Sequence, residues 1–376
     1  MPVMGRIRVC QLITELRPFG AERGVYELAR RLDRAKFDVQ VIGLRGGEVA
    51  DWLAAAGVPA SALGLRGKWD LGKLAKLAAL LRQWRPDILH THLFHADLAG
   101  RAAGYLAGVK HLLHTVHVAE ARFLPWRFAM ARLLSESCER IICVSPSVLD
   151  HHARRSGLPL SKYRLIPNGI DIDAYVRDRR RRSQCRAQWG VAQDQVVAAF
   201  VGRLDVQKGI DTLLEAIGRL RPARASIRFV LAGEGPLRAR VAAFVGRHEN
   251  QGFVRHLGFV HDVRAVLSAA DMLVMPSRWE GFGLAAVEAM AAGLPVIASD
   301  VAGLREVVVD KKTGLLIPRE NAAILADSIL ALANDAGLRT RLGESGLRRA
   351  REHYGIEKNV LAHERLYELI ADPSRQ

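Results

Sequence analysis

Short runs of β-branched and aliphatic residues alternate along this chain with longer segments in which apolar residues recur every three or four positions. In the first half the runs occupy residues 7–13, 39–44, 87–90, 112–116 and 140–144, and in the second half residues 196–201, 227–232, 254–258, 272–275, 295–298 and 315–317. Apolar strands separated by amphipathic helices are typical of βαβ units with a parallel sheet. The pattern predicts two doubly wound α/β domains.

The expected boundaries follow from length and from turn and charge signals. A chain of 376 residues suits two domains, here an N-terminal Rossmann-like domain over 1–168 and a C-terminal one over 191–354. We place a linker over 169–190, because turn residues at 167–169 are followed by an arginine-rich run at 177–182 that is too charged for a core. Apolar residues at helical spacing predict a final amphipathic helix over 355–376.

Candidate chemistry is densest at residues 276–303. Glu280 lies in a Trp-Glu-Gly-Phe-Gly turn directly after the apolar run 272–275, and Glu288 lies eight residues later in a helical run over 284–292. Gly281 and Gly283 allow close approach to a ligand, and the start of the helix offers unpaired N–H groups to an anion. The stretch is therefore a candidate phosphate site, although two solvated glutamates on an ordinary βα unit are the alternative.

Two further loops follow apolar runs of the second half. Arg203 and Lys208 come after the run 196–201, and both side chains suit phosphate oxygens. Gly-Glu-Gly-Pro at 233–236 follows the run 227–232, but Arg238 stands where a GxGxxG fingerprint needs glycine. The sequence has no GxxxxGK[ST], GxSxG or HExxH motif, so P-loop kinase, esterase and zincin functions lose their main support.

Histidines gather near two strands of the first half, where they raise the possibility of a metal site. Neutral imidazoles are common ligands, yet no cysteine or carboxylate stands beside them in a recognised metal spacing. A basic, aromatic segment at 121–132 comes next and suits either a membrane interface or a helix packed on the core. The histidines are His90, His92, His95, His111, His114 and His117; the segment contains Arg122, Phe123, Trp126, Arg127, Phe128 and Arg132.

Composition narrows the class of protein and its partners. With 49% apolar and 25% charged residues the chain is a folded globular protein. Lys and Arg number 55 against 39 acidic residues, and the net charge of +16 favours nucleic acid, an anionic membrane or phosphorylated substrates. The four cysteines form no CxxC pair, which suits a reducing cytoplasm, and the N-terminal apolar run is too short for a signal peptide or a spanning helix.

Four motifs, in order, carry a resemblance to a known family. Glu280, seven residues and Glu288, followed by Ala-Met-Ala-Ala-Gly-Leu-Pro-Val-Ile-Ala, resembles the EX7E signature of retaining GT-B glycosyltransferases of family 4, or group 1. The GRL…QKG loop at 202–209, the GEGP turn at 233–236 and Gly20-Ala21-Glu22 are similar to other motifs of that family, with Phe19 where glycine is common. The resemblance implies two Rossmann-like domains facing each other across a cleft, and transfer from a nucleotide diphosphate sugar to an acceptor hydroxyl.

The resemblance also implies roles for residues. Glu280 would contact the donor sugar and Glu288 the ribose, rather than forming a hydrolase acid and base pair, while Arg203 and Lys208 would hold the diphosphate and His117 the sugar hydroxyls. The implied catalytic set is His117, Arg203, Lys208 and Glu280; the donor-binding set is Gly20, Gly202, Arg203, Lys208, Gly233, Gly235, Glu280, Gly281, Phe282, Gly283, Leu284 and Glu288.

Partners and setting follow from the same resemblance. It implies no metal or other cofactor and an acceptor that is a lipid-linked or cell-surface glycan precursor, as in polysaccharide or lipopolysaccharide assembly. The expected location is the cytoplasm, with peripheral binding to the anionic cytoplasmic face of the inner membrane and no nucleic-acid partner. A GT-B nucleotide-sugar epimerase and a basic nucleic-acid-binding module are the alternatives.

Overall fold

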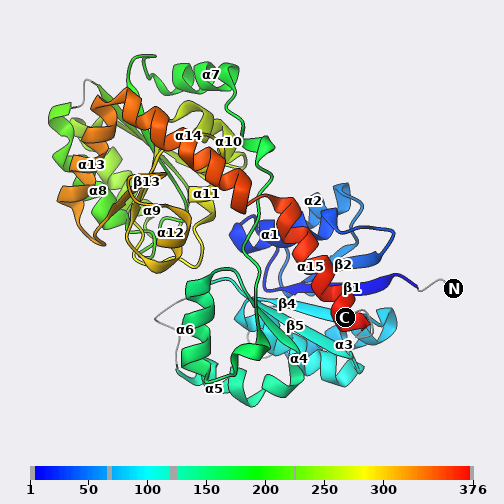
Figure 1. Cartoon of the computed structure of the whole chain (residues 1–376). Helices are drawn as coiled ribbons and strands as arrows, with labels where there is room; N and C mark the ends of the chain where they lie inside the picture. The colour runs from blue at the N-terminus through cyan, green and yellow to red at the C-terminus, as the bar shows by residue number, and fades with distance from the viewer. Residues whose placement is uncertain (1–4, 66–69, 119–124, 224–225, 373–376) are drawn as a thin grey trace. The chain divides into compact units, whose positions relative to one another are not determined.

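The chain folds into two compact units. The computed structural model describes residues 5–65, 70–118, 125–223 and 226–372. The first unit comprises Met1–Gly169 together with Ile356–Gln376, and the second comprises Ile170–Gly355 (Figure 1). The last helix thus belongs to the first unit, although it follows the second in sequence.

The first unit is built on a parallel sheet with helices between its strands. Among its described residues the strand order is β3-β2-β1-β4-β5-β6-β7, and Val9 of the central β1 pairs with Val39 of β2 and Ile88 of β4. The strands are β1 (Ile7–Ile13), β2 (Phe37–Gly43), β3 (Ala60–Ala62), β4 (Ile88–His92), β5 (His111–Val116), β6 (Arg140–Cys143) and β7 (Tyr163–Leu165). The helices are α1 (Gly20–Arg31), α2 (Val49–Ala55), α3 (Leu71–Trp84), α4 (Phe94–Ala107), α5 (Pro125–Leu133), α6 (Pro146–Ser156) and α15 (Ile356–Ala371), with short 3-10 helices at η1 (Ser135–Ser137) and η2 (Leu160–Lys162).

The second unit repeats the scheme. Its described strands are parallel in the order β10-β9-β8-β11-β12-β13. They are β8 (Val196–Val201), β9 (Ile227–Ala232), β10 (Val254–Gly258), β11 (Met272–Met275), β12 (Val296–Ser299) and β13 (Gly314–Ile317). The helices are α7 (Arg179–Trp189), α8 (Ile210–Arg219), α9 (Arg238–Val245), α10 (Val263–Ala269), α11 (Leu284–Ala291), α12 (Ala302–Val307), α13 (Ala322–Asn334) and α14 (Ala336–His353), with 3-10 helices η3 (Asp173–Tyr175), η4 (Arg221–Ala223) and η5 (His248–Asn250).

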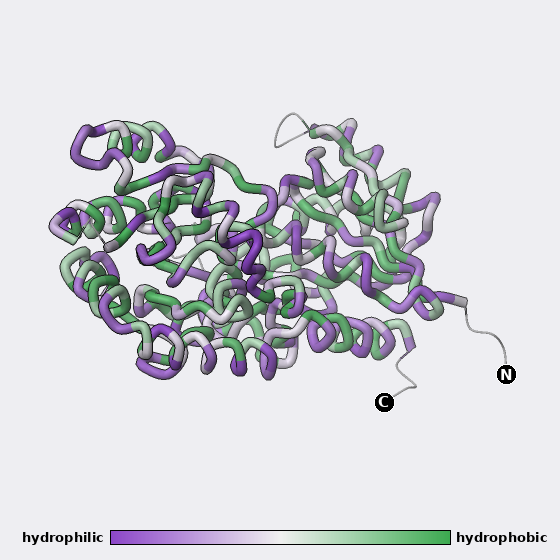
Figure 2. Tube along the Cα trace, turned by 90° about the horizontal axis from the view of Figure 1, so that it is seen from above, coloured by the Kyte–Doolittle hydropathy of each residue, from purple (hydrophilic) through white to green (hydrophobic). Residues whose placement is uncertain are grey.

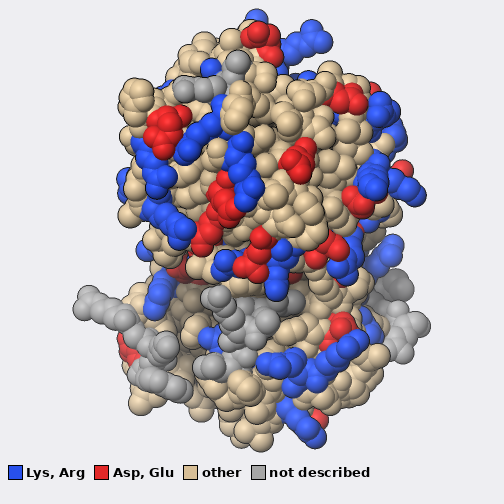
Figure 3. All heavy atoms as spheres, turned by 90° about the vertical axis from the view of Figure 1, so that its left-hand side faces the viewer, with Lys and Arg blue, Asp and Glu red and all other residues tan. Residues whose placement is uncertain are grey.

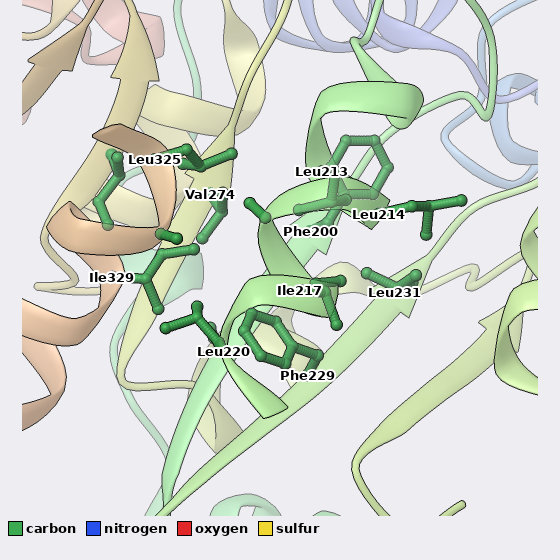
Figure 4. Packing of buried hydrophobic residues seen from close by; sticks show 14 of the residues in the cluster. Phe200, Leu213, Leu214, Ile217, Leu220, Phe229, Leu231, Val274, Leu325 and Ile329 are labelled. Atoms are coloured by element: carbon green, nitrogen blue, oxygen red, sulfur yellow. The ribbon is translucent and has the colours of Figure 1, made fainter. Parts of the chain in front are cut away.

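Each unit has its own hydrophobic core, which explains why the apolar runs predict the strands well. All six residues of β8 are buried, as expected for a central strand covered on both faces. In the second unit, α8 packs Leu213 and Ile217 against Phe200 and Phe229 of the sheet (Figure 4). Figure 2 shows hydrophobic segments alternating with hydrophilic ones along the trace. Burying one such side chain stabilises the fold by about 1.5–3 kcal/mol.

Both sheets have a point at which the strand order reverses. In the first unit it lies between β1 and β4, and in the second between β8 and β11. Open α/β sheets bind ligands at such a point, outside the carboxyl ends of the strands, because the flanking loops diverge there. The loops after β8 and β11 are those that carry the basic pair and the EX7E stretch.

The arginine-rich stretch differs from the linker predicted over 169–190. Most of it is α7, a helix of the second unit. Arg186 is fully buried and pairs with Asp271 at 2.6 Å, while its other N–H groups donate to backbone carbonyls such as that of Gln195. Arg182 also reaches Asp271, at 2.8 Å. A guanidinium with five donors can be buried once carboxylate and carbonyl oxygens surround it. For that reason this charged run forms a helix that packs on the second unit.

Candidate active site

The loops after β8 and β11 are tied together at the switch point of the second unit. The backbone N–H of Arg278 donates to the carbonyl of Gln207 at 2.7 Å, and the side chain of Gln207 donates to the carbonyl of Trp279 at 3.2 Å. Lys208 on one loop forms an ion pair with Glu280 on the other. The structure therefore brings together two residues that are 72 positions apart and that the sequence marks as candidates.

Glu280 is held in a fixed orientation. Its carboxylate is 7% exposed and accepts hydrogen bonds from Lys208 and from Ser277 Oγ, the latter at 2.9 Å. The sequence analysis did not single out Ser277, although its place three residues before Glu280 in the same turn is a usable signal. A carboxylate bound on one side by these two groups has lone pairs left for the hydroxyl groups of a ligand.

Asp205 shapes the loop that carries both cations. Its carboxylate pairs with the guanidinium of Arg203 at 2.6 Å and accepts from the backbone N–H of Lys208 at 3.1 Å. An aspartate that bonds the backbone three residues later is a common turn former, so the sequence contained this signal too. The Arg203 side chain is more than half exposed, so its charge faces solvent.

Glycines let the backbones of these loops touch. A Cβ at Gly233 would lie 1.9 Å from the carbonyl oxygen of Gly202, and one at Gly235 would lie 2.5 Å from that of Leu204. The GEGP turn after β9 therefore packs directly on the loop after β8. The aliphatic part of Lys208 lies over Gly202. A Cβ added at Gly202 would lie 3.6 Å from Cε of Lys208.

The predicted anion site at the start of α11 has the expected backbone. Gly283 precedes the helix with φ +90°, and a Cβ there would lie 2.6 Å from Leu304. The N–H groups of Leu284 and its neighbour stand at the first turn, where a helix has no internal acceptors for them. The side chain of Phe282 is 5% exposed and packs edge to face on Tyr354, with 5.4 Å between the ring centroids.

Glu288 lies on the second turn of α11 and is 9% exposed. The hydroxyl of Tyr175, in η3, donates to its Oε1 at 2.7 Å. Sequence reasoning missed Tyr175, and no local signal could have found it, because it is 113 residues away from its partner. The hydrogen bond sets the direction in which the second carboxylate of the EX7E stretch points.

Gly20 and His117 belong to the first unit, whereas the other candidate residues belong to the second. Gly20 opens α1, and the preceding Phe19 is partly exposed. His90 and His92 share one side of β4, with ring centroids 4.2 Å apart. His92 Nδ1 lies 3.1 Å from Nε2 of His117, which follows β5. Burial lowers the pKa of His90 and His92 well below the usual value and that of His117 to about 3, so the rings are neutral.

Within the described ranges, no group of three or more His, Cys, Asp or Glu side chains is arranged to hold a metal ion. Burial raises the pKa of Cys10, Cys138 and Cys143 to about 12, so these cysteines are thiols at neutral pH and poor metal ligands.

The basic, aromatic segment is partly α5. Arg122 and Phe123 lie outside the described residues. Phe128 is buried, in agreement with core packing, whereas Trp126 is 48% and Leu133 75% exposed. The guanidinium of Arg127 stacks over Phe94 at 4.5 Å. The helix thus combines a buried face with an exposed apolar edge.

Family models and known proteins match most of this chain. The model for Glycosyltransferase Family 4 matches residues 19–174, and that for Glycosyl transferases group 1 matches residues 181–349. An alpha-maltose-1-phosphate synthase of Mycolicibacterium smegmatis is 31% identical over 294 residues, which cover 71% of this chain and 75% of that protein. The chain belongs to the family 4, group 1 glycosyltransferases.

Two further proteins similar to this chain act on or bind a nucleotide sugar. An Escherichia coli UDP-Gal:alpha-D-GlcNAc-diphosphoundecaprenol alpha-1,3-galactosyltransferase is 26% identical, with coverage of 84% of this chain and 85% of that one. The crystal structure of Anabaena Alr3699/HepE in complex with UDP-glucose superposes with a TM-score of 0.87 at 22% identity, covering 97% of this chain and 100% of that one. The prediction of a GT-B fold with two Rossmann-like domains is confirmed.

Within the residues that the structure describes, no helix combines the length and the apolar character needed to cross a bilayer.

Gly209 directly follows Lys208 in a tight turn. Gly209→Ala is expected to lower the free energy of unfolding of the second unit. Gly209 has φ +67°, and a Cβ would lie 1.9 Å from the carbonyl oxygen of Pro276. Backbone strain and overpacking together should cost about 3 kcal/mol or more, measured by urea unfolding. The matched control is Gly252→Ala, at φ +68° with open space around it, which should cost only about 1–2 kcal/mol. Equal losses in the two variants would contradict the tight contact.

Proposed function

We propose that this glycosyltransferase binds the donor diphosphate against Arg203 and Lys208 and the donor sugar against Glu280, and that it transfers the sugar with retention of configuration. The observation that carries the proposal is the ion pair of Lys208 with Glu280 at the switch point between β8 and β11, with Arg203 on the same loop as Lys208. Charge develops on the leaving diphosphate during transfer, and a positioned guanidinium, an ammonium and the N–H groups at the start of α11 stabilise it.

The proposed retention involves no enzymic nucleophile. Glu280 is bound by Lys208 and Ser277, an arrangement that suits a fixed acceptor for sugar hydroxyls. Attack by the acceptor hydroxyl on the face from which the diphosphate leaves then gives retention. Glu288, oriented by Tyr175, is assigned to the ribose hydroxyls.

The test is a calorimetric binding screen of UDP-, GDP- and ADP-linked sugars, followed by NMR of the first product formed. Tight binding of one donor and a product with the donor's anomeric configuration would support the proposal. A product of inverted configuration would overturn retention. Nucleotide-sugar turnover without any added acceptor would favour the epimerase alternative.

We propose that transfer needs no metal ion, because Arg203 and Lys208 supply the positive charge that a divalent cation would otherwise bring to the diphosphate. The expected result is an unchanged rate of transfer after dialysis against EDTA. A complete loss of activity that zinc or manganese restores would contradict this proposal. It would favour a metal site at the histidines of the first unit.

We further propose a lipid-linked glycan precursor as the acceptor, used at an anionic membrane surface. The relative from Escherichia coli is named for an acceptor carried on diphosphoundecaprenol. Such an anchor stays in the bilayer, so the enzyme must approach it, and α5 offers exposed Trp126 and Leu133 beside the exposed Arg132. Each basic residue near anionic lipid contributes about 1 kcal/mol.

We therefore expect the protein to sediment with anionic vesicles and not with zwitterionic ones, less strongly as salt is added. Trp126→Ser combined with Arg132→Glu should weaken sedimentation about tenfold or more, through the loss of an interfacial ring and the reversal of a charge. The matched control is Phe259→Ser with Arg255→Glu, an exposed pair in the second unit with the same change in charge. Indifference to both vesicle types at low salt would contradict docking and point to a soluble acceptor.

Some of the arginines that contribute to the net charge of +16 have structural partners. Arg182 and Arg186 of α7 pair with Asp271 and donate to backbone carbonyls. On the face drawn in Figure 3, Lys and Arg side chains are interspersed with Asp and Glu. Tight, salt-sensitive binding to duplex DNA without sugar transfer would favour the nucleic-acid alternative.

A further inference from the structure

The last helix of the chain places a tyrosine among the histidines of the first unit. Tyr367 lies on α15 and is fully buried, with its ring edge to face against Phe37 at 6.0 Å between centroids. Its hydroxyl contacts Nε2 of Gln11 on β1 at 2.9 Å and Nδ1 of His90 on β4 at 2.7 Å. The last helix of the chain thus lies against the first sheet (Figure 1) and brings a polar side chain to β1 and β4.

Gln11 extends this contact toward His117. Its Oε1 lies 2.6 Å from Nε2 of His92, and Nδ1 of His92 lies 3.1 Å from Nε2 of His117. On the other side of the tyrosine hydroxyl, Nε2 of His90 lies 2.7 Å from Thr115 Oγ1. A continuous chain of hydrogen bonds therefore runs from His117 through the tyrosine to Thr115.

Along this series of hydrogen bonds, the position of the proton on one side chain determines the position of the proton on the next. A neutral imidazole has one N–H group and one lone pair, and a side-chain amide donates from nitrogen and accepts at oxygen. Because Gln11 donates to Tyr367 and accepts at Oε1, His92 donates from Nε2 and accepts at Nδ1. Nε2 of His117 is then the donor to His92, and Nδ1 of His117 keeps its lone pair.

Neutral rings are a condition for this coupling. An imidazolium has two N–H groups, so it could not accept a hydrogen bond from its neighbour. Burial is the largest cause that lowers the pKa of His90, His92 and His117, and it keeps all three neutral at pH 7.

We propose that Tyr367 is a positioning residue that acts through Gln11 and His92 to hold His117 in one tautomer, with its proton on Nε2 and a lone pair on Nδ1. His117 then accepts a hydrogen bond at Nδ1 from a hydroxyl group of the sugar or the acceptor and donates none from that nitrogen. This use of the tautomer rests on the proposed transferase function, in which His117 takes the role at the sugar hydroxyls that the family resemblance implies.

The test is nitrogen NMR of the full chain labelled with ¹⁵N-histidine, in which the two ring nitrogens report the tautomer of each histidine. His117, assigned from the signal lost in His117→Gln, is expected to be a single tautomer in the native protein. Tyr367→Phe removes the hydroxyl and should give His117 a mixture of tautomers. The matched control is Tyr163→Phe, which removes a hydroxyl bonded to His152 in the same unit and should leave His117 unchanged.

Gln11→Leu interrupts the series of hydrogen bonds next to His92. It replaces Tyr367→Phe in the test if that variant does not fold. A single, unchanged tautomer of His117 in the folded variants would overturn the proposal, as would a native His117 with its proton on Nδ1. The maximal rate of transfer should fall about two- to tenfold in Tyr367→Phe, in proportion to the population that leaves the competent tautomer. Mixed tautomers with an unchanged rate would support the hydrogen-bond chain and contradict instead the place of His117 in the reaction.

Discussion

Replacement of Lys208 or of Arg203 by alanine is expected to lower the rate of sugar transfer at least about 100-fold, or about 2.7 kcal/mol of transition-state stabilisation. Lys208 bonds Glu280 across two loops, and Arg203 is held by Asp205 at 2.6 Å, so both charges are in place before the diphosphate departs. Charge that needs no reorganisation during the reaction contributes most to the rate.

The measurement is steady-state transfer at saturating and at limiting donor. The matched control is Arg219→Ala, which removes an exposed arginine of the second unit that pairs with Glu215, and which should leave the rate unchanged. Circular dichroism should show that all three variants fold. Unchanged turnover in both Arg203→Ala and Lys208→Ala at both donor concentrations would remove these two residues from the site.

Acidification is expected to destabilise the first unit steeply below about pH 6.5. Burial lowers the pKa of His363 to about 4 and that of His90 and His92 well below the usual value. Between pH 6.5 and about 4 these side chains bind protons in the unfolded chain and not in the native one, so stability is complete above that window and is lost as the pH falls through it.

The expected slope can be bounded. Burial also lowers the pKa of His117 to about 3 and that of His152 to about 4 in the same unit. Each of these five histidines contributes about 1.4 kcal/mol per pH unit within the window, or about 7 kcal/mol together, and His114, whose pKa burial also lowers, adds to this. Burial raises the pKa of Glu22 to about 7, and this carboxyl has the opposite sign, because it favours the folded state as the pH falls from 7 toward 4.5. The net slope is then about 6 kcal/mol per pH unit or more.

Urea unfolding between pH 7.5 and 5, followed by hydrogen-exchange labelling of peptides from each unit, measures this slope. His363→Gln should reduce the slope of the first unit by about one proton, whereas replacement of the exposed His353 by Gln should not. A first unit whose stability is flat between pH 6.5 and 5 would contradict neutral burial of these histidines.

The sequence predicted most strands well, because a buried strand is a short run of apolar residues that are neighbours in sequence. The runs at 196–201 and 272–275 are uniformly apolar, and they are β8 and β11 to the residue. The edge strands β3 and β7 were not predicted, since three residues with mixed exposure carry no periodic signal. The structure differs from the predicted linker for a related reason: local composition shows the charge of α7 but not Asp271, whose carboxylate pairs with Arg182 and Arg186.

In the candidate site, too, the sequence predicted some features and only the structure showed the others. Composition and order of residues were enough to mark Arg203, Lys208, Glu280 and Glu288, because a phosphate-binding loop and its glycines are contiguous in sequence. Only the tertiary structure decided that Lys208 pairs with Glu280 and that the side chain of Phe282 turns inward.

Contacts between distant segments account for the rest of what the tertiary structure decided. Tyr175 lies 113 residues from Glu288, and Tyr367 lies 356 residues from Gln11. The periodicity of a helix or strand shows which of its faces is buried, and it carries no information about the partner that covers that face. The sequence alone therefore determined the fold and the residue types of the loops after β8 and β11, while the packing of distant helices decided how the carboxylates and histidines are oriented.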